Sequence, residues 1–226
     1  MQDAIPVEFM LAEPVRSRPY LLAKRLMDVL VSSSLLVALA PLLGALALAV
    51  RLDSPGPILF RQERVGERGR VFTCLKFRSM RVAADTAPHR AYAAAFIQGQ
   101  AGQQPTAGGG VYKLVEDERV TRVGRWLRRT SLDELPQLWN VLRGEMSLVG
   151  PRPPIPYELQ FYQDTHFQRL AARPGITGLW QVSGRNTTTF EEMVALDLAY
   201  IRHPSLRQDV WILLRTLPVV LACRAA

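Results

Sequence analysis

Two adjacent carboxylates, Asp133 and Glu134, closely follow a cluster of arginines at Arg125, Arg128 and Arg129. A carboxylate can attack phosphorus and form an acyl phosphate, provided that cations neutralise the anionic substrate first. Mg²⁺ prefers oxygen ligands and usually takes only one or two carboxylates from protein. Neighbouring acids on one helix point about 100° apart, so one can face phosphorus while the other holds the metal. The pair therefore indicates a site for metal-assisted attack on a phosphate.

The same residues also allow a purely structural interpretation. Ser131 and Glu134 have the spacing of a capping box, and an apolar run over 135–142 follows them. Asp133 would then be a first-turn acid that complements the helix dipole. The residues alone leave both interpretations open.

The cationic side chains are unevenly divided, because 25 of the 28 are Arg and the net charge is +8. Arg grips phosphate with a planar fork, so the excess favours a polyanionic partner such as phospholipid headgroups, a nucleotide diphosphate or nucleic acid. A nucleic-acid partner is not favoured, because Lys is scarce and basic and aromatic residues do not interleave. Cys74 and Cys223 have neither the number nor the spacing of a disulfide framework or a zinc site.

A long apolar segment precedes the acidic pair. The 22 residues 29–50 carry no charge, and this is long enough to cross a bilayer core as a helix. Pro41 lies near the middle, where it removes a helix hydrogen bond and favours a kink. Cations lie at both ends, Lys24 and Arg25 before the segment and Arg51 after it, whereas a spanning helix usually has its cations mainly on the cytoplasmic side. A spanning helix and a re-entrant helix both remain open.

The rest of the chain predicts an α/β fold that is mostly α, with one small β-hairpin. The hairpin is expected from strands at 58–62 and 71–77 around a turn at 66–69. We expect helices at 83–97, 119–129, 135–142, 157–172 and 190–203, a flexible insertion at 98–110, and a tight turn at 173–178. The tail 205–222 is apolar with interspersed Arg, which favours an interfacial helix and leaves a core-packing helix open.

The run 130–154, TSLDELPQLWNVLRGEMSLVGPRPP, resembles the signature of the bacterial sugar transferases, the monotopic phosphoglycosyl transferases. The resemblance implies that Asp133 is the nucleophile, that Glu134 and Asp133 bind Mg²⁺, and that a sugar 1-phosphate passes from a UDP-sugar to undecaprenyl phosphate with release of UMP. It also implies a place at the bacterial inner membrane with the active site on the cytoplasmic face, among membrane lipids with anionic headgroups. The pathway implied is exopolysaccharide, O-antigen or capsule assembly, with glucose or galactose favoured as the sugar.

The resemblance extends in order from residue 23 to about residue 216 and implies further roles. Asp197 matches an acid that pairs with a basic residue of the site. Ala40 and Pro41 stand where the family bends its re-entrant helix at a Ser-Pro pair, so the proline is present and the serine is not. The residues implied to bind phosphate or nucleotide are Lys76, Arg128, Arg152, Arg173, Arg185 and Asn186.

The expected organisation has three parts: a leader at 1–19, a membrane re-entrant (or transmembrane) segment at 20–51, and a catalytic domain at 52–226. Larger family members carry extra membrane helices in front of this unit, so the chain resembles the minimal catalytic form. The alternative is a non-catalytic, membrane-anchored basic scaffold. That alternative does not account for an acid pair among arginines. Whether the chain forms a homo-oligomer is left open.

Overall fold

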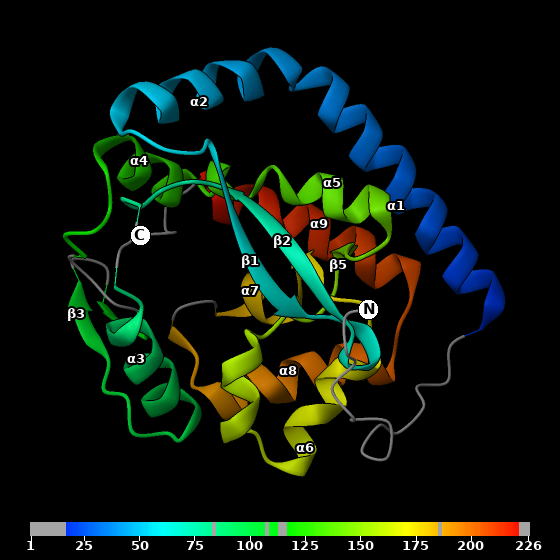
Figure 1. Ribbon diagram of the computed structural model, residues 1–226. Helices are drawn as coiled ribbons and strands as arrows, with labels where there is room; N and C mark the ends of the chain where they lie inside the picture. The colour runs from blue at the N-terminus through cyan, green and yellow to red at the C-terminus, as the bar shows by residue number, and fades with distance from the viewer. Residues whose placement is uncertain (1–16, 83–84, 107–108, 113–116, 185–186, 222–226) are drawn as a thin grey trace.

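A bent helical arc borders one side of the molecule (Figure 1). The computed structural model describes residues 17–82, 85–106, 109–112, 117–184 and 187–221. Within them, α1 (Arg18–Ala38) and α2 (Ala40–Asp53) meet at Leu39 with a bend of 64°. Pro41 occupies the first turn of α2, where its missing N–H is tolerated, so the break falls where the sequence predicts a hinge. None of the described helices is individually long and apolar enough to cross a membrane, whereas the bent pair together meets that requirement by length and composition.

Six short strands form three separate two-stranded sheets in the described residues. The predicted hairpin is confirmed: β1 (Leu59–Val65) pairs antiparallel with β2 (Val71–Phe77), with Phe60 opposite Lys76. A small hairpin of β3 (Gln104–Thr106) and β4 (Gly109–Val111) lies in and just after the 98–110 insertion, where the sequence predicts a loop. The predicted turn at 173–178 is wrong, because β6 (Gly175–Thr177) pairs in parallel with β5 (Ser147–Val149). A three-residue strand is too short to show the alternation by which a strand is recognised.

The helices surround these strands. The helices predicted at 83–97, 119–129 and 190–203 correspond to α3, α4 and α8. The single helix predicted at 157–172 is wrong, because three short helical segments, η4, α6 and η5, occupy that region. The bounds are α3 Ala87–Ile97, α4 Arg122–Thr130, η3 Leu132–Glu134, α5 Gln137–Arg143, η4 Pro156–Phe161, α6 Asp164–Phe167, η5 Gln168–Ala171, α7 Leu179–Ser183, α8 Phe190–Arg202 and α9 Leu206–Leu221.

The main core lies between β2, α5, β5 and α9, where Val141, Val149 and Ile212 are fully buried. Asn140 of α5 joins this core to the hairpin. Its Oδ1 accepts from the backbone N–H of Leu75, and its Nδ2 donates to the carbonyl of Thr73. Because β1 is the one strand that pairs with β2 in the described residues, Asn140 satisfies backbone groups that would otherwise be buried without partners. The side chain thereby fixes α5, and the acids that precede it, against β2.

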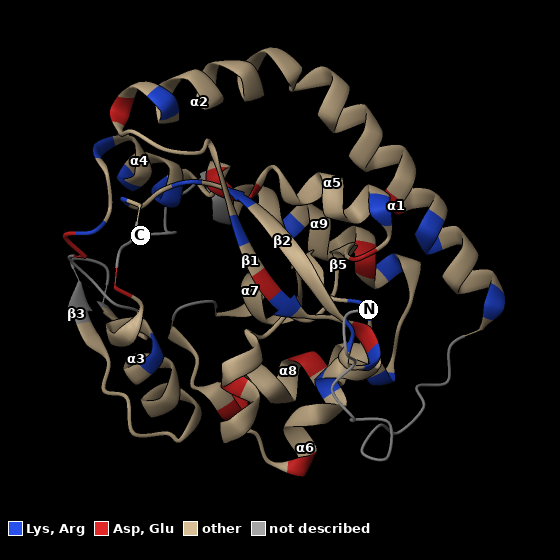
Figure 2. Ribbon diagram, viewed as in Figure 1, with Lys and Arg blue, Asp and Glu red and all other residues tan. Residues whose placement is uncertain are grey.

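Buried polar contacts fix the N-terminal half of α1 to the rest of the molecule. Arg25 donates to the carbonyls of Val141 and Leu142 at the end of α5. Asp28 accepts from the Ser147 hydroxyl and from the Leu148 N–H, each at 3.0 Å. Farther along, Figure 2 shows the remainder of α1 and most of α2 without charged residues. The arc therefore has a polar base held by the globular part and an apolar bend.

Helix α9 has one buried face and one exposed apolar face. Asp209 and Ile212 are completely buried against the core. Trp211, Leu214 and Leu217 are exposed along the other side, which gives the helix an uncovered apolar surface. The sequence left an interfacial helix and a core-packing helix open. The buried face of α9 packs on the core, and its opposite, exposed apolar face is of the kind that an interfacial helix has.

Candidate active site

The two acids lie on a sharp reversal between α4 and α5. Helix α4 ends at Thr130 because Ser131 adopts a left-handed conformation with φ of 57°. The predicted capping box is wrong, since the Ser131 side chain makes no capping hydrogen bond and a short 3₁₀ turn, η3, carries the acids. A non-glycine residue with positive φ is uncommon and marks a constrained backbone. The reversal places Asp133 in a largely buried position, with 9% of its surface exposed.

Lys76 of β2 lies beside the acidic pair. Its Nζ donates to Glu134 Oε1 at 2.8 Å, so Glu134 faces the hairpin rather than the start of a helix. In an antiparallel pair, directly opposed residues share a face, and therefore Lys76, Gln62 and Arg64 all project from the same side of the hairpin. The hairpin therefore places Lys76 next to the acidic pair.

Burial and neighbouring charges determine the protonation of Asp133. Burial raises the pKa of its carboxyl to about 6, and the nearby Glu134 adds to that rise. Lys76 and Arg128 oppose the rise, because each favours the ionised form. The carboxylate is thus ionised above pH 6 and poorly hydrated, two properties that suit a nucleophile.

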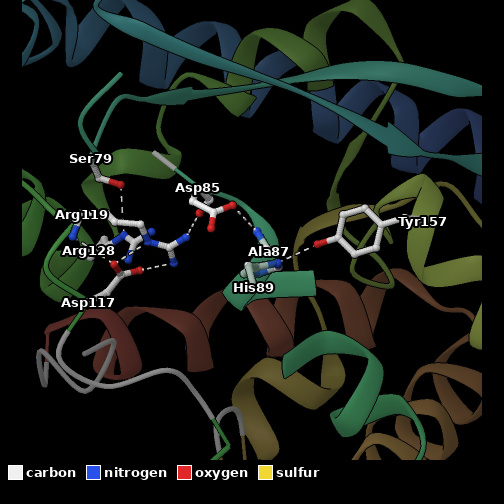
Figure 3. A network of polar contacts seen from close by, with 8 residues as sticks. All are labelled: Ser79, Asp85, Ala87, His89, Asp117, Arg119, Arg128 and Tyr157. Carbon is white, nitrogen blue, oxygen red and sulfur yellow. Dashed lines mark hydrogen bonds and ion pairs between the residues drawn. The ribbon is translucent and has the colours of Figure 1, made fainter. Parts of the chain in front are cut away.

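Arg128 projects from α4 toward the acids and is mostly buried. Its Nε donates to Ser79 Oγ at 3.0 Å, and burial lowers the pKa of its guanidinium while Asp133 raises it. Arginine remains charged in proteins, so this side is permanently cationic. Figure 3 shows a second guanidinium nearby, that of Arg119. It donates two hydrogen bonds to the Asp117 carboxylate and one to the backbone carbonyl of Asp85.

The start of α3 faces the same network from the other side (Figure 3). His89, which received no role from the sequence, lies with Nδ1 2.6 Å from the hydroxyl of Tyr157 in η4. Arg90 stacks its guanidinium over the Tyr157 ring at 4.9 Å. These contacts attach α3 to the segment that follows the Pro-rich loop.

Two buried arginines that the sequence did not identify support the loop carrying Arg152. Arg64 donates to the carbonyl of Pro153 at 2.8 Å, and Arg169 donates to the carbonyl of Arg152 at 3.3 Å. Arg169 also donates its Nε to Asp197 Oδ2 at 2.8 Å, so the partner of Asp197 is a buried arginine that the sequence did not assign to the site. Burial raises the pKa of Asp197 to about 6, against the opposing effect of Arg169. Arg152 itself is exposed.

Not every predicted residue joins this group. Arg173 lies with Nε 3.8 Å from Glu67 in the hairpin turn, and at about 3.3 Å per residue that turn is roughly 20 Å along the hairpin from Lys76. Arg185 and Asn186 lie outside the described residues. The structure therefore brings together Lys76, Arg128, Asp133 and Glu134, and leaves Arg173 at a distance.

The acidic pair has the donor chemistry of a magnesium site. Among the residues described here, no cluster contains three or more His, Cys, Asp or Glu side chains able to hold a metal ion. Zinc sites require three or four such ligands, whereas Mg²⁺ is held by one or two carboxylates together with water and substrate phosphate. The Glu134 side chain is 30% exposed, so a hydrated ion can reach it. Asp133 and Glu134 therefore have the carboxylate oxygens that a Mg²⁺ ion could take as ligands.

Comparison with known proteins gives consistent matches over most of the chain. Residues 19–223 match the model of the family described as bacterial sugar transferase. The exopolysaccharide production protein ExoY of Sinorhizobium fredii is 41% identical over 205 residues, which cover 91% of this chain and 88% of ExoY.

Two further relatives carry the names of sugar-transferring enzymes. The galactosyl transferase CpsE of Streptococcus agalactiae is 44% identical over 203 residues, covering 89% of this chain and 43% of CpsE. The UDP-glucose:undecaprenyl-phosphate glucose-1-phosphate transferase of Caulobacter vibrioides is 46% identical over 208 residues, covering 88% of this chain and 70% of that enzyme. The chain spans about two fifths of the length of several relatives, CpsE among them.

Proposed function

We propose that this chain, which belongs to the bacterial sugar transferase family, transfers a sugar 1-phosphate from a UDP-sugar to undecaprenyl phosphate. The observation that carries the proposal is the buried Asp133 beside the Lys76–Glu134 pair and Arg128. The names of relatives support both substrates, since they include undecaprenyl-phosphate galactose and glucose phosphotransferases. Two exopolysaccharide production proteins among them support a role at the start of glycan assembly.

The proposed chemistry has two displacements at one phosphorus. In the first, a carboxylate oxygen of Asp133 bonds to the β-phosphorus of the UDP-sugar, the bond from that phosphorus to the bridging oxygen breaks, and UMP leaves. In the second, a phosphate oxygen of undecaprenyl phosphate bonds to the same phosphorus and Asp133 is released. The product is an undecaprenyl-diphosphate sugar, and the kinetics are ping-pong.

The surrounding cations make the first displacement electrostatically feasible. An anionic carboxylate must approach an anionic diphosphate, and Lys76 and Arg128 reduce that repulsion from two sides. When bound between Glu134 and Asp133, Mg²⁺ would supply further positive charge to the diphosphate. Lys76 also orients Glu134 through their 2.8 Å contact. The exposed Arg152, on a loop held by Arg64 and Arg169, is suited to bind the departing nucleotide.

The bent arc supports a monotopic placement at the cytoplasmic face of the inner membrane. We propose that α1 and α2 enter the bilayer and return to the same side, since their 64° bend and their cationic ends suit a re-entrant helix. A cysteine placed at position 20 and another at position 54 should both resist a membrane-impermeant thiol reagent applied from the periplasm. Periplasmic labelling at position 20 alone would instead indicate a spanning helix.

The direct test is UMP release by the full chain in nanodiscs, given undecaprenyl phosphate and a panel of UDP-sugars. We expect release with UDP-glucose or UDP-galactose, dependent on the lipid and lost when EDTA removes Mg²⁺. Restoration by added Mg²⁺ excludes damage by the chelator. No release with any UDP-sugar would contradict the proposal and favour the membrane-anchored scaffold.

The transfer rate should rise with pH through the titration of Asp133. Because the pKa of this carboxyl is about 6, the reactive ionised fraction falls roughly tenfold per pH unit below that value. Lys76→Met removes a charge that lowers this pKa, so the midpoint of the profile of kcat/KM should move to higher pH. The pKa of Asp197 is also about 6, but it is set by burial and Arg169 and not by Lys76, so Lys76→Met should leave the pKa of Asp197 unchanged. A midpoint unchanged by Lys76→Met would assign the profile to another group.

A further inference from the structure

A histidine and a tyrosine are in contact among the arginines of the site. His89 of α3 has Nδ1 2.6 Å from the hydroxyl of Tyr157, and the two rings meet edge to face with their centroids 6.5 Å apart. The two residues are 68 positions apart in the sequence, so the fold and not a local pattern brings them together. We refer to His89 and Tyr157 as the His–Tyr pair.

The start of α3 ties the His–Tyr pair to the cationic side of the site that contains Arg128. The backbone carbonyl of Asp85 accepts a hydrogen bond from Arg119, and the Asp85 side chain accepts one from the backbone N–H of Ala87. His89 follows Ala87 by two residues in the first turn of the helix. Figure 3 shows these residues in one group that extends from Arg128 to the His–Tyr pair.

Further arginines act on the pair from the side of the Pro-rich loop. Burial lowers the pKa of the His89 imidazole, against the opposing charge of Glu158. The guanidinium groups of Arg152, Arg64 and Arg119 lower this pKa further. The histidine is therefore uncharged at neutral pH, although cations surround it.

The pair keeps hydrogen-bonding capacity beyond its own contact. Burial raises the pKa of the Tyr157 hydroxyl, so this group keeps its proton at neutral pH. We assign the hydroxyl as the donor to His89 Nδ1, which places the ring proton on Nε2. Within the described residues, Nε2 makes no hydrogen bond and the hydroxyl oxygen accepts none. Both side chains are half-buried, so a ligand can reach one uncharged donor and one uncharged acceptor.

The orientation of the tyrosine is fixed from one side. The Arg90 guanidinium lies over the Tyr157 ring, 4.9 Å from its centroid, which is a cation–π contact. This contact and the bond to His89 hold the hydroxyl in one direction. A donor and an acceptor held in this way are suited to orient a ligand.

The chemistry of the His–Tyr pair differs from that of the arginines around it. Guanidinium groups bind phosphate, and they suit the diphosphate of a UDP-sugar. A sugar hydroxyl is uncharged and both donates and accepts hydrogen bonds, so an uncharged donor beside an uncharged acceptor matches it. Attachment of α3 to η4 uses one donor and one acceptor of the pair and leaves the other two for a ligand.

We propose that the His–Tyr pair binds the hydroxyl groups of a sugar ring in the donor substrate. This proposal rests on the proposed function, which supplies the UDP-sugar as donor. A UDP-sugar has two such rings, the ribose of the nucleotide and the transferred hexose, and both present the same chemistry. The pair does not attack or protonate the reacting phosphorus, so it contributes to binding of the donor and not to the chemical step.

The test measures the affinity of UDP-glucose and UDP-galactose by calorimetry, with the full chain in nanodiscs and Mg²⁺ present. The chain carries Asp133→Asn, so that no transfer occurs and affinity alone is measured. His89→Leu should weaken binding roughly tenfold, because a buried sugar hydroxyl loses its partner. Tyr157→Phe should weaken binding less, because the Nε2 donor of His89 remains.

Two controls separate a sugar contact from a general effect. His203→Leu makes the same change at an exposed histidine after α8 and should leave the affinity unchanged. Inorganic diphosphate has no sugar ring and should bind equally well with and without His89→Leu. An equal loss of diphosphate affinity would mean that His89 supports the phosphate site or the fold, and would overturn the proposal. Unchanged affinity for both UDP-sugars in His89→Leu would also overturn it.

Binding of UDP identifies which ring the pair contacts. UDP keeps the ribose and lacks the hexose. Equal weakening of UDP and the UDP-sugars by His89→Leu would assign the pair to the ribose. Weakening of the UDP-sugars alone would assign it to the hexose, where it would help to select the sugar.

The binding measurement also separates this proposal from the proposed function. A wild-type chain that binds UDP-sugars but releases no UMP would contradict the transfer reaction, while the effect of His89→Leu on affinity would still support the His–Tyr pair. An active wild-type chain whose donor affinity does not depend on His89 would overturn only the role of the pair.

Discussion

Asp133→Asn is expected to lower sugar phosphate transfer by roughly four orders of magnitude or more, the scale seen when a covalent nucleophile is removed. The amide has nearly the same shape but no charge and little nucleophilicity. Wild-type protein given UDP-sugar without undecaprenyl phosphate should retain the phosphosugar on the peptide that contains Asp133, and mass spectrometry of a digest measures this. Full activity in Asp133→Asn would show that another residue attacks phosphorus.

Loss of activity in this variant should not reflect unfolding. Burial raises the folded-state pKa of Asp133 from 3.8 to about 6, so the folded protein binds this proton more tightly than the unfolded chain does. The resulting contribution to stability is greatest below pH 3.8, declines as the pH rises to about 6, and stays lost above it. The Asp133→Asn variant has no carboxyl that must ionise while buried, so it does not lose this stability as the pH rises. Its Tm near neutral pH should therefore equal or exceed that of the wild type. Asp164→Asn, an exposed site on α6, controls for a general effect of removing charge.

Asp197→Ala should lower the free energy of unfolding by about 3–5 kcal/mol, because it leaves Arg169 as a buried cation without its carboxylate. Only 3% of Arg169 is exposed, so water cannot replace the lost partner. Activity should fall as well, since Arg169 supports the loop through the carbonyl of Arg152. Denaturant unfolding in detergent micelles measures the first effect and UMP release the second.

The double variant Arg169→Met/Asp197→Leu distinguishes stability from positioning. Replacing both buried charges by apolar side chains should recover most of the stability, because no unpaired charge remains. It should not recover full activity if the loop depends on its hydrogen bond from Arg169. Equal recovery of both properties would mean that the pair has only a structural role.

The sequence predicted the parts of this molecule that depend on local chemistry. The hairpin of β1 and β2 follows from strand-forming runs around a turn, and the bend at Leu39 follows from Pro41. The meeting of Lys76 with Glu134 required more than local preference, since 58 residues separate them. The family resemblance assigned both residues to the site without predicting their ion pair, whereas periodicity alone would have left Glu134 as a helix cap.

Other features depend on long-range packing that no local pattern expresses. Arg64 and Arg169 stand in ordinary amphipathic contexts, and their role emerges only because both reach the carbonyls of one loop. The parallel pairing of β5 with β6 joins three-residue segments more than 20 positions apart. Ser131 looked like the start of a helix, but its left-handed backbone ends one. Such a conformation is set by the surrounding fold.

The ion pair at the base of the arc has a consequence for how the protein is made. Lys24 of α1 lies 3.0 Å from Asp209 of α9, and Tyr20 donates to the same carboxylate across 189 positions of sequence. During synthesis, the nascent arc leaves the ribosome long before Asp209 exists. Until then the base of the arc can be held only by contacts with earlier segments, such as those of Arg25 and Asp28 with residues 141–148. Docking of α9 therefore completes the attachment of the arc, and a chain stalled before residue 209 would lack the contacts of Tyr20 and Lys24 with Asp209.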